Sequence, residues 1–398
     1  MLGWELPPHN SGGLGVACYQ LCQTLSKNGV DIEFVLPYQA ANNIDFMKIT
    51  SAIPTDVNEV IQMGGIYDSY KFIKKDGQIE WHDIVSHSSV YEKSVEKLVT
   101  YSEFDVIHAH DWLTFRAALR AKAIKNRPLI LHVHSIEHDR AGGKYGNPYV
   151  HEIEYMSLQV ADQIIAVSNH TKNAIIREYQ IPPEKILVIH NSIDSYNLPV
   201  IDEANSFQYL EQLKAEGYKI ITNVGRLTIQ KGLYNLMQVA KQVTNFEPKT
   251  MFLIVGSGDQ YFELIELAAE LGISRNVIFT GFLRGKQWRD AFAVSDLFIM
   301  PSVSEPFGLT PLEAAGYGTA SLVSKQSGVA EVFNNCLKAD YWDINKMTDE
   351  VISFIKNPGL QETLSTNSHN EFLGMSWQKA ADELTSNYHK HVNEMVAL

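Results

Sequence analysis

The sequence predicts an α/β fold of two doubly wound, Rossmann-like domains, each built on a parallel sheet. Apolar runs of strand length alternate with longer segments of helical periodicity along nearly all 398 residues, which is typical of βαβ units. The polar stretch 192–216 separates two groups of such runs, and its first part is rich in turn-forming residues. We therefore expect one domain over 1–195, a second over 200–376, and a linker near 191–199.

Each expected strand is a short apolar run that ends at polar or turn-forming residues. In the first domain these runs are 32–37, 106–109, 129–133, 164–167 and 186–189. In the second domain they are 220–224, 251–255, 277–280, 297–300 and 320–323. A strand at 1–4 would be about two or three residues shorter than usual, which suggests that the start of the sequence is clipped.

Composition excludes several classes of protein. The 46 acidic and 33 basic side chains give a formal charge of −13, which argues against a nucleic-acid partner because phosphate backbones select basic surfaces. The three cysteines show no CxxC or metal-ligand spacing and are typical of reduced thiols. No apolar stretch approaches the roughly 20 residues of a membrane helix, and the start does not resemble a signal peptide. We expect a cytoplasmic protein.

The segment SVSEPFGLTPLE, residues 302–313, is the most informative part of the chain. It follows the expected strand 297–300, at the edge of the sheet where open α/β folds bind ligands. Glu305 would lie in the loop and Glu313 one turn into the next helix, an arrangement suited to holding a sugar nucleotide. The backbone N–H groups expected to point toward an anion are those of Phe307, Gly308 and Leu309.

Both carboxylates have an alternative explanation. Thr310, Pro311 and Glu313 match a capping box with Pro at the first helical position, so Glu313 could simply satisfy the start of the helix. Glu305 could be an ordinary solvated loop residue.

A glycine loop, Ser11-Gly12-Gly13-Leu14-Gly15, precedes the helical run 16–25. Its N–H groups could approach a diphosphate without interference from side chains, or it could be a tight strand-to-helix turn. It is neither GxGxxG nor a Walker loop, which argues against kinases and dinucleotide enzymes.

A second phosphate-binding element is expected at 224–232, VGRLTIQKG. Arg226 and Lys231 flank the turn that follows a strand, and together they would form a cationic clamp. Taken separately, Arg226 and Lys231 could each be an ordinary surface cation that only favours solubility.

Two histidine pairs follow expected strands, in HAHD at 108–111 and HVHS at 132–135. Strand periodicity places His110 and His134 at strand ends, where function is expected, whereas His108 and His132 are expected to be packed core histidines. A metal site here is conceivable, but no HExxH or Cys/His spacing supports it. No Asp-x-Asp occurs to hold a metal–nucleotide complex, so we expect no metal, with the cationic clamp in its place.

These motifs jointly resemble glycosyltransferase family 4, the group 1 glycosyltransferases of GT-B fold, and within it the glycogen/starch-synthase-like branch. The resemblance covers nearly all of the chain. The segments that carry it are GWELPPHNSGGLG at 3–15, HAHDWLT at 108–114, HSIEHDR at 134–140, ADQIIAVSNHTK at 161–172, GRLTIQKG at 225–232, GSGD at 256–259, FTGFLRG at 279–285, PSVSEPFGLTPLEAAGYGT at 301–319 and SKQSGVAEV at 324–332. The glycine loop lacks the lysine of the KTGGL sequence of bacterial glycogen synthases.

The resemblance implies roles for individual residues. Glu305 would face the donor sugar, and Glu313 would accept hydrogen bonds from the ribose hydroxyls. Arg226 and Lys231 would bind the diphosphate, and His134 would lie beside the reacting sugar. Further donor-binding residues would be Gly12, Gly13, Gly15, Gly256, Phe282, Phe307, Gly308, Leu309 and Thr310, and the acceptor-side residues would be His110, Asp111, Glu137 and Asp139. The helix 377–398 would pack back onto the first domain.

The implied activity is transfer of a hexose, with glucose expected, from UDP- or ADP-glucose to an α-glucan or oligosaccharide, with retention of configuration and without cofactor or metal. Two alternatives stay open. The acceptor could be a lipid or cell-envelope component, since the cations in RAALRAKAIKNR, 116–127, could touch an anionic membrane peripherally, although a solvated helix face explains them too. The chain could also be a nucleotide-sugar-binding module without catalysis.

Overall fold

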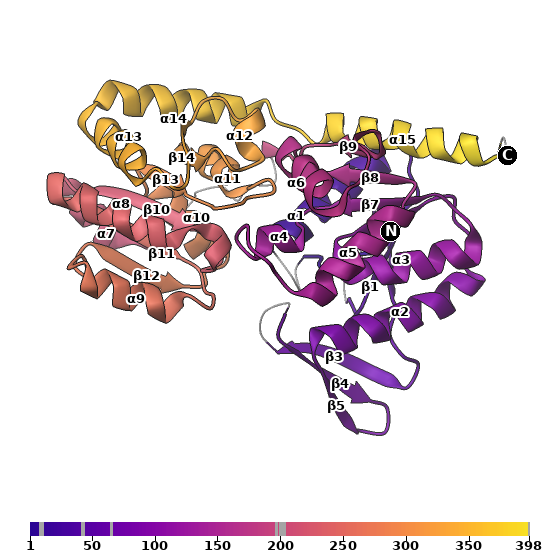
Figure 1. Cartoon of the computed structure of the whole chain (residues 1–398). Coiled ribbons are helices and arrows are strands. Elements are labelled where there is room, and N and C mark those ends of the chain that lie inside the picture. The colour runs from indigo at the N-terminus through magenta and orange to yellow at the C-terminus, as the bar shows by residue number, and fades with distance from the viewer. Residues whose placement is uncertain (8–11, 41–43, 64–66, 196–197, 199–203, 397–398) are drawn as a thin grey trace. The chain divides into compact units, whose positions relative to one another are not determined.

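The computed structural model describes residues 1–7, 12–40, 44–63, 67–195, 198 and 204–396. It divides into two compact units. The first comprises Met1–Glu137, Gly146–Asn191 and Trp377–Leu398, and the second His138–Tyr145 and Ser192–Ser376. Each unit is a parallel sheet flanked by helices, which confirms the predicted α/β class (Figure 1). Ser11 of the glycine loop and part of the expected linker lie outside the described residues.

The first unit contains one parallel sheet that the N-terminal segment completes. Leu2 makes parallel bridges to Val35 and to Ala109, so it joins the pair β1-β2 to the group β6-β7-β8-β9. The strands are β1 (Glu33–Leu36), β2 (Lys48–Ser51), β6 (Ile107–His110), β7 (Leu129–Val133), β8 (Gln163–Ala166) and β9 (Ile186–Val188). The helices are α1 (Gly13–Lys27), α2 (Ile84–Tyr101), α3 (Trp112–Lys125), α4 (Glu137–Arg140, which runs into the second unit), α5 (Pro148–Val160), α6 (Asn169–Tyr179) and α15 (Gln378–Val396).

A separate antiparallel sheet, which the sequence pattern did not predict, extends the first unit. It consists of β3 (Val57–Met63), β4 (Ser69–Lys74) and β5 (Ile79–His82), in the order β3-β4-β5. Tyr70 and Phe72 on one of its faces are fully buried, and Trp4 Nε1 donates to the Tyr70 hydroxyl at 3.2 Å. This face therefore packs into the core of the first unit.

The second unit holds a six-stranded parallel sheet in the order β12-β11-β10-β13-β14-β15. The strands are β10 (Lys219–Val224), β11 (Thr250–Val255), β12 (Val277–Gly281), β13 (Leu297–Met300), β14 (Ala320–Ser324) and β15 (Leu337–Ala339). The helices are α7 (Gln208–Ala215), α8 (Leu233–Phe246), α9 (Tyr261–Glu270), α10 (Gly285–Ala293), α11 (Thr310–Gly316), α12 (Val329–Val332), α13 (Ile344–Lys356) and α14 (Pro358–Leu373). The chain builds outward from β10 to β12 and then returns to the other side of β10, so the order of the strands reverses between β10 and β13.

The expected apolar strands are confirmed within one or two residues of their ends. All residues of β11, β13 and β14 are buried, because helices cover both faces of the sheet. The core of each unit is formed where these apolar strands pack against the apolar faces of the helices that flank them. Within the described ranges, none of the helices is both long and apolar enough to cross a bilayer.

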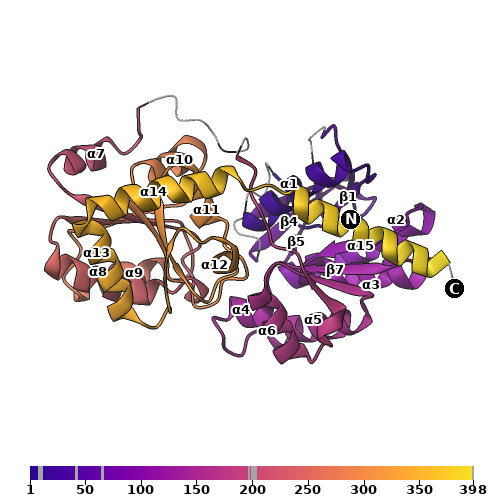
Figure 2. The ribbon, with the colours of Figure 1, turned by 90° about the horizontal axis from the view of Figure 1, so that it is seen from above.

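Helix α15 belongs to the first unit although it lies at the end of the chain. It packs on α1, as Figure 2 shows. Trp377, directly before it, is fully buried, and its indole Nε1 donates to Gln20 Oε1 of α1 at 2.7 Å. The Tyr388 hydroxyl, within α15, contacts His108 Nδ1. Hydrogen bonds to α1 and β6, together with those from Asn387 and His391 to Gln163 Oε1 of β8, therefore hold this C-terminal segment on the first unit.

Replacing Trp377 with Phe should destabilise the protein by about 1–3 kcal/mol, because the buried Gln20 Oε1 loses its donor. Chemical denaturation gives the free energy of unfolding for wild type and variant. Lys379→Ala is the control, since the Lys379 side chain is 89% exposed on the same helix and should change stability by no more than about 0.5 kcal/mol. Equal effects of the two substitutions would contradict the assigned role of Trp377.

Candidate functional site

The loops that follow β10 and β13 are neighbours, because these strands pair at the point where the strand order reverses. Open α/β sheets bind ligands at such a point, beyond the carboxyl ends of the strands. The first loop carries Arg226 and Lys231, and the second carries Glu305. The predicted cationic clamp and the predicted glutamate motif thus belong to one site of the second unit.

Lys231 and Glu305 form an ion pair, with Nζ and Oε2 2.5 Å apart. Their side chains are 21% and 9% exposed, so water screens the pair weakly. Ser302 Oγ donates to the same Oε2 at 3.1 Å. Glu305 is therefore a buried, partnered carboxylate and not the solvated loop residue of the alternative explanation.

Hydrogen bonds to its backbone hold the Glu305 loop from both sides. Glu305 N donates to Gln326 O at 2.9 Å, and Gly328 N donates to Glu305 O at 3.0 Å, so the loop after β14 pairs with it like a strand. On the other side, Gln230 Nε2 donates to Ser304 O at 3.0 Å and Val303 N donates to Gln230 O at 2.9 Å. Gln230 and Gln326 were not predicted as site residues, because their only signal in the sequence is their position inside motifs.

Two glycines let the backbone segments of this site approach closely. A Cβ on Gly232 would lie 2.1 Å from Pro301 O, and its φ is +67°. A Cβ on Gly256 would lie 1.8 Å from Gly225 O, and its φ is +140°. Any side chain at either position would push the strand-end loops apart. Gly256 therefore has a structural role whether or not it also contacts a ligand.

Glu313 lies one turn into α11 and does not cap it. The helix begins at Thr310 with Leu309 as its N-cap, and no side chain bonds to its first N–H groups. The capping box of the alternative explanation is therefore not formed, because Thr310 lies one position inside the helix and its hydroxyl points to Met300 Sδ, 3.9 Å away. Burial raises the pKa of Glu313 to about 7. The carboxyl is thus near its titration midpoint at neutral pH.

The remaining predicted donor residues occupy different environments. Arg226 is exposed, and no ion pair joins it to another described residue. Phe282 is 60% exposed, with the Arg284 guanidinium 5.0 Å from its ring centre. Phe307 is buried, and its carbonyl accepts from Val329 N at 2.8 Å. Gly308 has a φ of +94°, which a residue with a side chain would adopt only with strain. Arg226 and Phe282 are therefore the side chains open to a ligand.

In the first unit, helix α1 begins earlier than predicted. Gly13 is its first residue and Gly15 is buried in its first turn, so the expected glycine loop is mostly helix. Gly12 is the N-cap, and a Cβ there would lie 2.7 Å from Glu5 Oε2. A Cβ on Gly13 would meet no atom within 4 Å. The N–H groups of this first turn could donate hydrogen bonds to an anion, and the space at Gly13 could accommodate it.

The histidines of β6 and β7 form a stack. His108, His110 and His132 are buried, and His110 Nδ1 lies 3.1 Å from His134 Nε2. Burial lowers the pKa of all four, that of His134 to about 3. They are therefore neutral at pH 7. His110 is the last residue of β6, at the strand end as predicted, but its side chain is buried and contacts the ring of His134.

Asp111 orients the end of β7. Its φ is +58°, uncommon for a residue with a side chain, and its Oδ1 accepts from His134 N at 2.7 Å and from Ser135 N at 3.3 Å. The strained backbone is compensated by these two bonds. Asp111 thus fixes the backbone at His134 and Ser135, and its acceptor-side role stays a prediction.

The other two predicted acceptor-side residues lie in or next to α4. Glu137 Oε1 accepts from Asn147 N at 2.7 Å, so it closes the 138–146 loop. Asp139 is fully buried, and its Oδ1 accepts from Ser304 Oγ at 2.5 Å within the second unit. Asp139 therefore positions Ser304, the residue before Glu305. The sequence did not indicate this contact.

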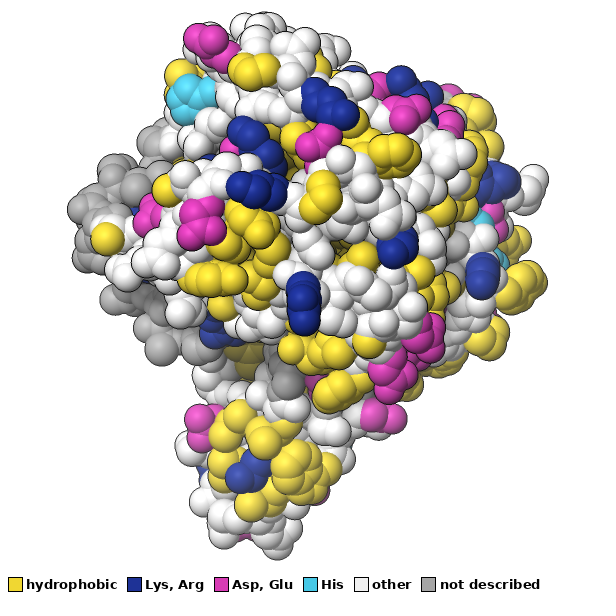
Figure 3. Space-filling view, turned by 90° about the vertical axis from the view of Figure 1, so that its left-hand side faces the viewer, with side chains coloured by type: hydrophobic (Ala, Val, Ile, Leu, Met, Phe, Trp, Pro, Cys, Tyr) yellow, Lys and Arg dark blue, Asp and Glu magenta, His cyan; other side chains and the backbone are white. Residues whose placement is uncertain are grey.

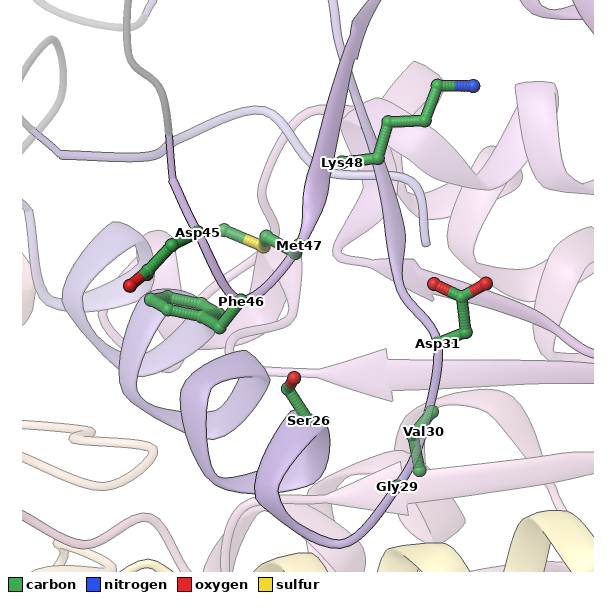
Figure 4. A pocket seen from close by; sticks show the side chains of 8 residues that line it. All are labelled: Ser26, Gly29, Val30, Asp31, Asp45, Phe46, Met47 and Lys48. Atoms are coloured by element: carbon green, nitrogen blue, oxygen red, sulfur yellow. The ribbon is translucent and has the colours of Figure 1, made fainter.

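A pocket in the first unit lies near the amino ends of β1 and β2. It is lined by the end of α1 and the segments just before β1 and β2, including Ser26, Asp31, Asp45 and Lys48 (Figure 4). It therefore opens at the amino ends of the strands, whereas ligands of parallel sheets bind at the carboxyl ends.

Comparison with known proteins bears on both units. The family model described as "Glycosyl transferases group 1" matches residues 207–371, and that described as "Glycosyltransferase Family 4" matches residues 11–196. An uncharacterized glycosyltransferase of Methanocaldococcus jannaschii is 27% identical over 100% of this chain and 98% of its own length. A glycogen synthase of Mycobacterium tuberculosis is 27% identical over 84% of this chain and 80% of its own. The solved sucrose-phosphate synthase of Thermosynechococcus elongatus superposes with a TM-score of 0.72 at 17% identity, covering 98% of this chain and 95% of its own, and supports the fold alone.

Replacing Glu313 with Gln should stabilise the protein progressively more between pH 4.5 and 7 and by a constant amount above pH 7. The unfolded carboxyl titrates near pH 4.5 and the folded one near 7. Between these values only the unfolded state is ionised, so the wild type loses stability relative to the variant as the pH rises, and above pH 7 both states are ionised and the difference is constant. Denaturation of variant and wild type at several pH values measures the difference. The exposed Glu266, changed to Gln, is the control. A difference that does not change over this range would contradict the buried position of the Glu313 carboxyl.

Proposed function

The chain belongs to the group 1 and family 4 glycosyltransferases of GT-B fold, and we propose that it is a retaining enzyme that transfers glucose from UDP- or ADP-glucose to an α-glucan or oligosaccharide. The observation that carries this proposal is the Lys231–Glu305 pair at the carboxyl edge of the second sheet. A cation and a carboxylate held together there suit the two ends of a sugar diphosphate.

The chemistry requires stabilisation of a leaving group. Breaking the bond between the anomeric carbon and the phosphate oxygen builds negative charge on the diphosphate and oxocarbenium character on the sugar. Lys231 Nζ can donate to a phosphate oxygen while Glu305 keeps it in place. Arg226 is exposed on the same loop and can supply a second, bidentate contact. Glu305 faces the electron-poor sugar carbon.

Glu313 is suited to bind the ribose of the donor. With a pKa of about 7 it can accept a hydrogen bond from a hydroxyl when ionised and donate one when protonated. Two neighbouring ribose hydroxyls would replace the water that burial has removed from this carboxyl. Nucleotide binding should then favour its ionised form and lower its pKa.

We propose that the reaction needs no metal. The clamp of Lys231 and Arg226 offers two positive charges to a diphosphate, which is the role that a divalent ion fills in other transferases. The sequence contains no Asp-x-Asp pair through which such an ion is held.

His134 contributes as a neutral group. Because burial holds its pKa near 3, it presents a hydrogen bond and not a positive charge. We propose that it binds a hydroxyl of the donor sugar, with Asp111 and His110 fixing its backbone and ring.

A carbohydrate acceptor has support from the relatives, since a glycogen synthase and a sucrose-phosphate synthase are among the similar proteins. The decisive experiment measures nucleotide release from UDP-, ADP- and GDP-sugars in the presence of EDTA, with and without maltooligosaccharides or glycogen. Release from one glucose donor that a glucan stimulates supports the proposal. Slow release that no glucan stimulates would move the acceptor to a lipid or small molecule, and no release at all would leave a sugar-nucleotide-binding protein.

Replacing Lys231 with Ala should lower kcat/KM for the donor by roughly 10- to 150-fold, since a charge-assisted hydrogen bond to phosphate contributes about 1.5–3 kcal/mol. Lys356→Ala is a matched control, because Lys356 also forms an ion pair, with Glu247 at 3.0 Å, on the surface of the same unit. A melting curve verifies that the Lys231 variant is folded. Unchanged donor kinetics in the folded variant would overturn the phosphate assignment.

A further inference from the structure

The antiparallel sheet β3-β4-β5 has two apolar faces, of which the protein covers one. Residues directly opposite each other in the pairing point to the same side. Tyr70 and Phe72 point inward and are buried. Ile61, Lys71 and Trp81 are opposite one another and point to the other side, which we call the outer face.

The outer face exposes large hydrophobic side chains. Met63 is 48% exposed, Ile79 50% and Trp81 60%, and Ile61 and Ile73 beside them are partly exposed. Figure 3 shows these hydrophobic side chains gathered around a basic one at the tip formed by this sheet. An antiparallel sheet ordinarily turns a polar face to water, so an apolar patch here indicates a partner.

Two opposite charges are placed on the outer face in a regular way. Glu59 is opposite Ile73, and Ile61 is opposite Lys71. The four residues thus form a rectangle with the charges on one diagonal and the isoleucines on the other. Neither Glu59 nor Lys71 forms an ion pair with another side chain in the described part of the chain.

We propose that the outer face binds the outer face of a second copy of this chain, giving a two-fold symmetric dimer. A two-fold axis along the Ile61–Ile73 diagonal stacks each isoleucine on its own counterpart and places Lys71 of each copy against Glu59 of the other. Neighbouring strands are about 4.8 Å apart and alternate residues about 6.8 Å, so both charge pairs are within reach of the side chains. The face is therefore complementary to itself in shape and in charge.

The charge of this sheet favours a second copy over a membrane. Residues 57–82 contain three lysines against four Asp and Glu, and the whole chain has a formal charge of −13. Anionic lipid attracts clusters of basic residues, which this sheet lacks. Trp81 is the one aromatic side chain on the described outer face, so a stacked sugar chain would have a single ring to bind.

Sedimentation velocity of the full chain tests the proposal, and a dimer is expected at micromolar concentration. Lys71→Glu and Glu59→Lys should each raise the dimer dissociation constant by roughly tenfold or more, because each places like charges together twice. The double reversal, Lys71→Glu with Glu59→Lys, should restore wild-type affinity. Phe262→Ala, at a 76% exposed aromatic of the second unit, is the control and should leave the dimer unchanged.

A second measurement uses the residue on the proposed axis. Ile73→Cys should form a disulfide between two copies under mild oxidation, whereas Ile265→Cys, at a 39% exposed position of α9, should not. Ile73 is partly exposed and Ile265 is exposed, so both positions should tolerate cysteine, and circular dichroism verifies folding. A monomeric wild type, a double reversal that does not restore the dimer, or binding to anionic vesicles or glycogen that Trp81→Ala abolishes would each overturn the proposal.

Discussion

The second unit depends on the ion pair between Lys231 and Glu305, which ties the loop after β10 to the loop after β13. A buried pair of this kind contributes little net stability but makes the loss of one partner costly, since the other charge is left without compensation. The same glutamate bonds through its backbone to the loop after β14. One residue therefore joins the loops that follow three strands of the second sheet.

Close packing accounts for two features of the second unit, the glycines where its loops meet and the raised pKa of Glu313. Gly232 and Gly256 lack the side chains that would keep the strand-end loops apart, and burial raises the pKa of Glu313 to about 7. In the first unit the histidine stack is held neutral by burial in a similar way. Both units thus present polar groups whose protonation is set by the packing around them.

The sequence was sufficient for the fold class and for most of the second unit's site, because strands buried on both faces are uninterrupted apolar runs and the site motifs follow them directly. It was insufficient where contacts are long-range. The antiparallel strands β3 to β5 alternate weakly because both their faces are apolar, and the helix start at Gly13 depends on tertiary packing that overrides propensity. Tyr388 and Asp139 contact site residues from distant parts of the chain, which no local pattern encodes.

The order of the chain has a consequence for biosynthesis. The second unit is complete at Ser376, whereas the first still lacks Trp377 and α15, which complete its core against α1. During synthesis on the ribosome, the first unit is therefore started first but completed last. Until α15 has been made, the core of this unit keeps apolar surface exposed. Such intermediates aggregate readily, so the first unit is where we expect chaperones to be needed during synthesis.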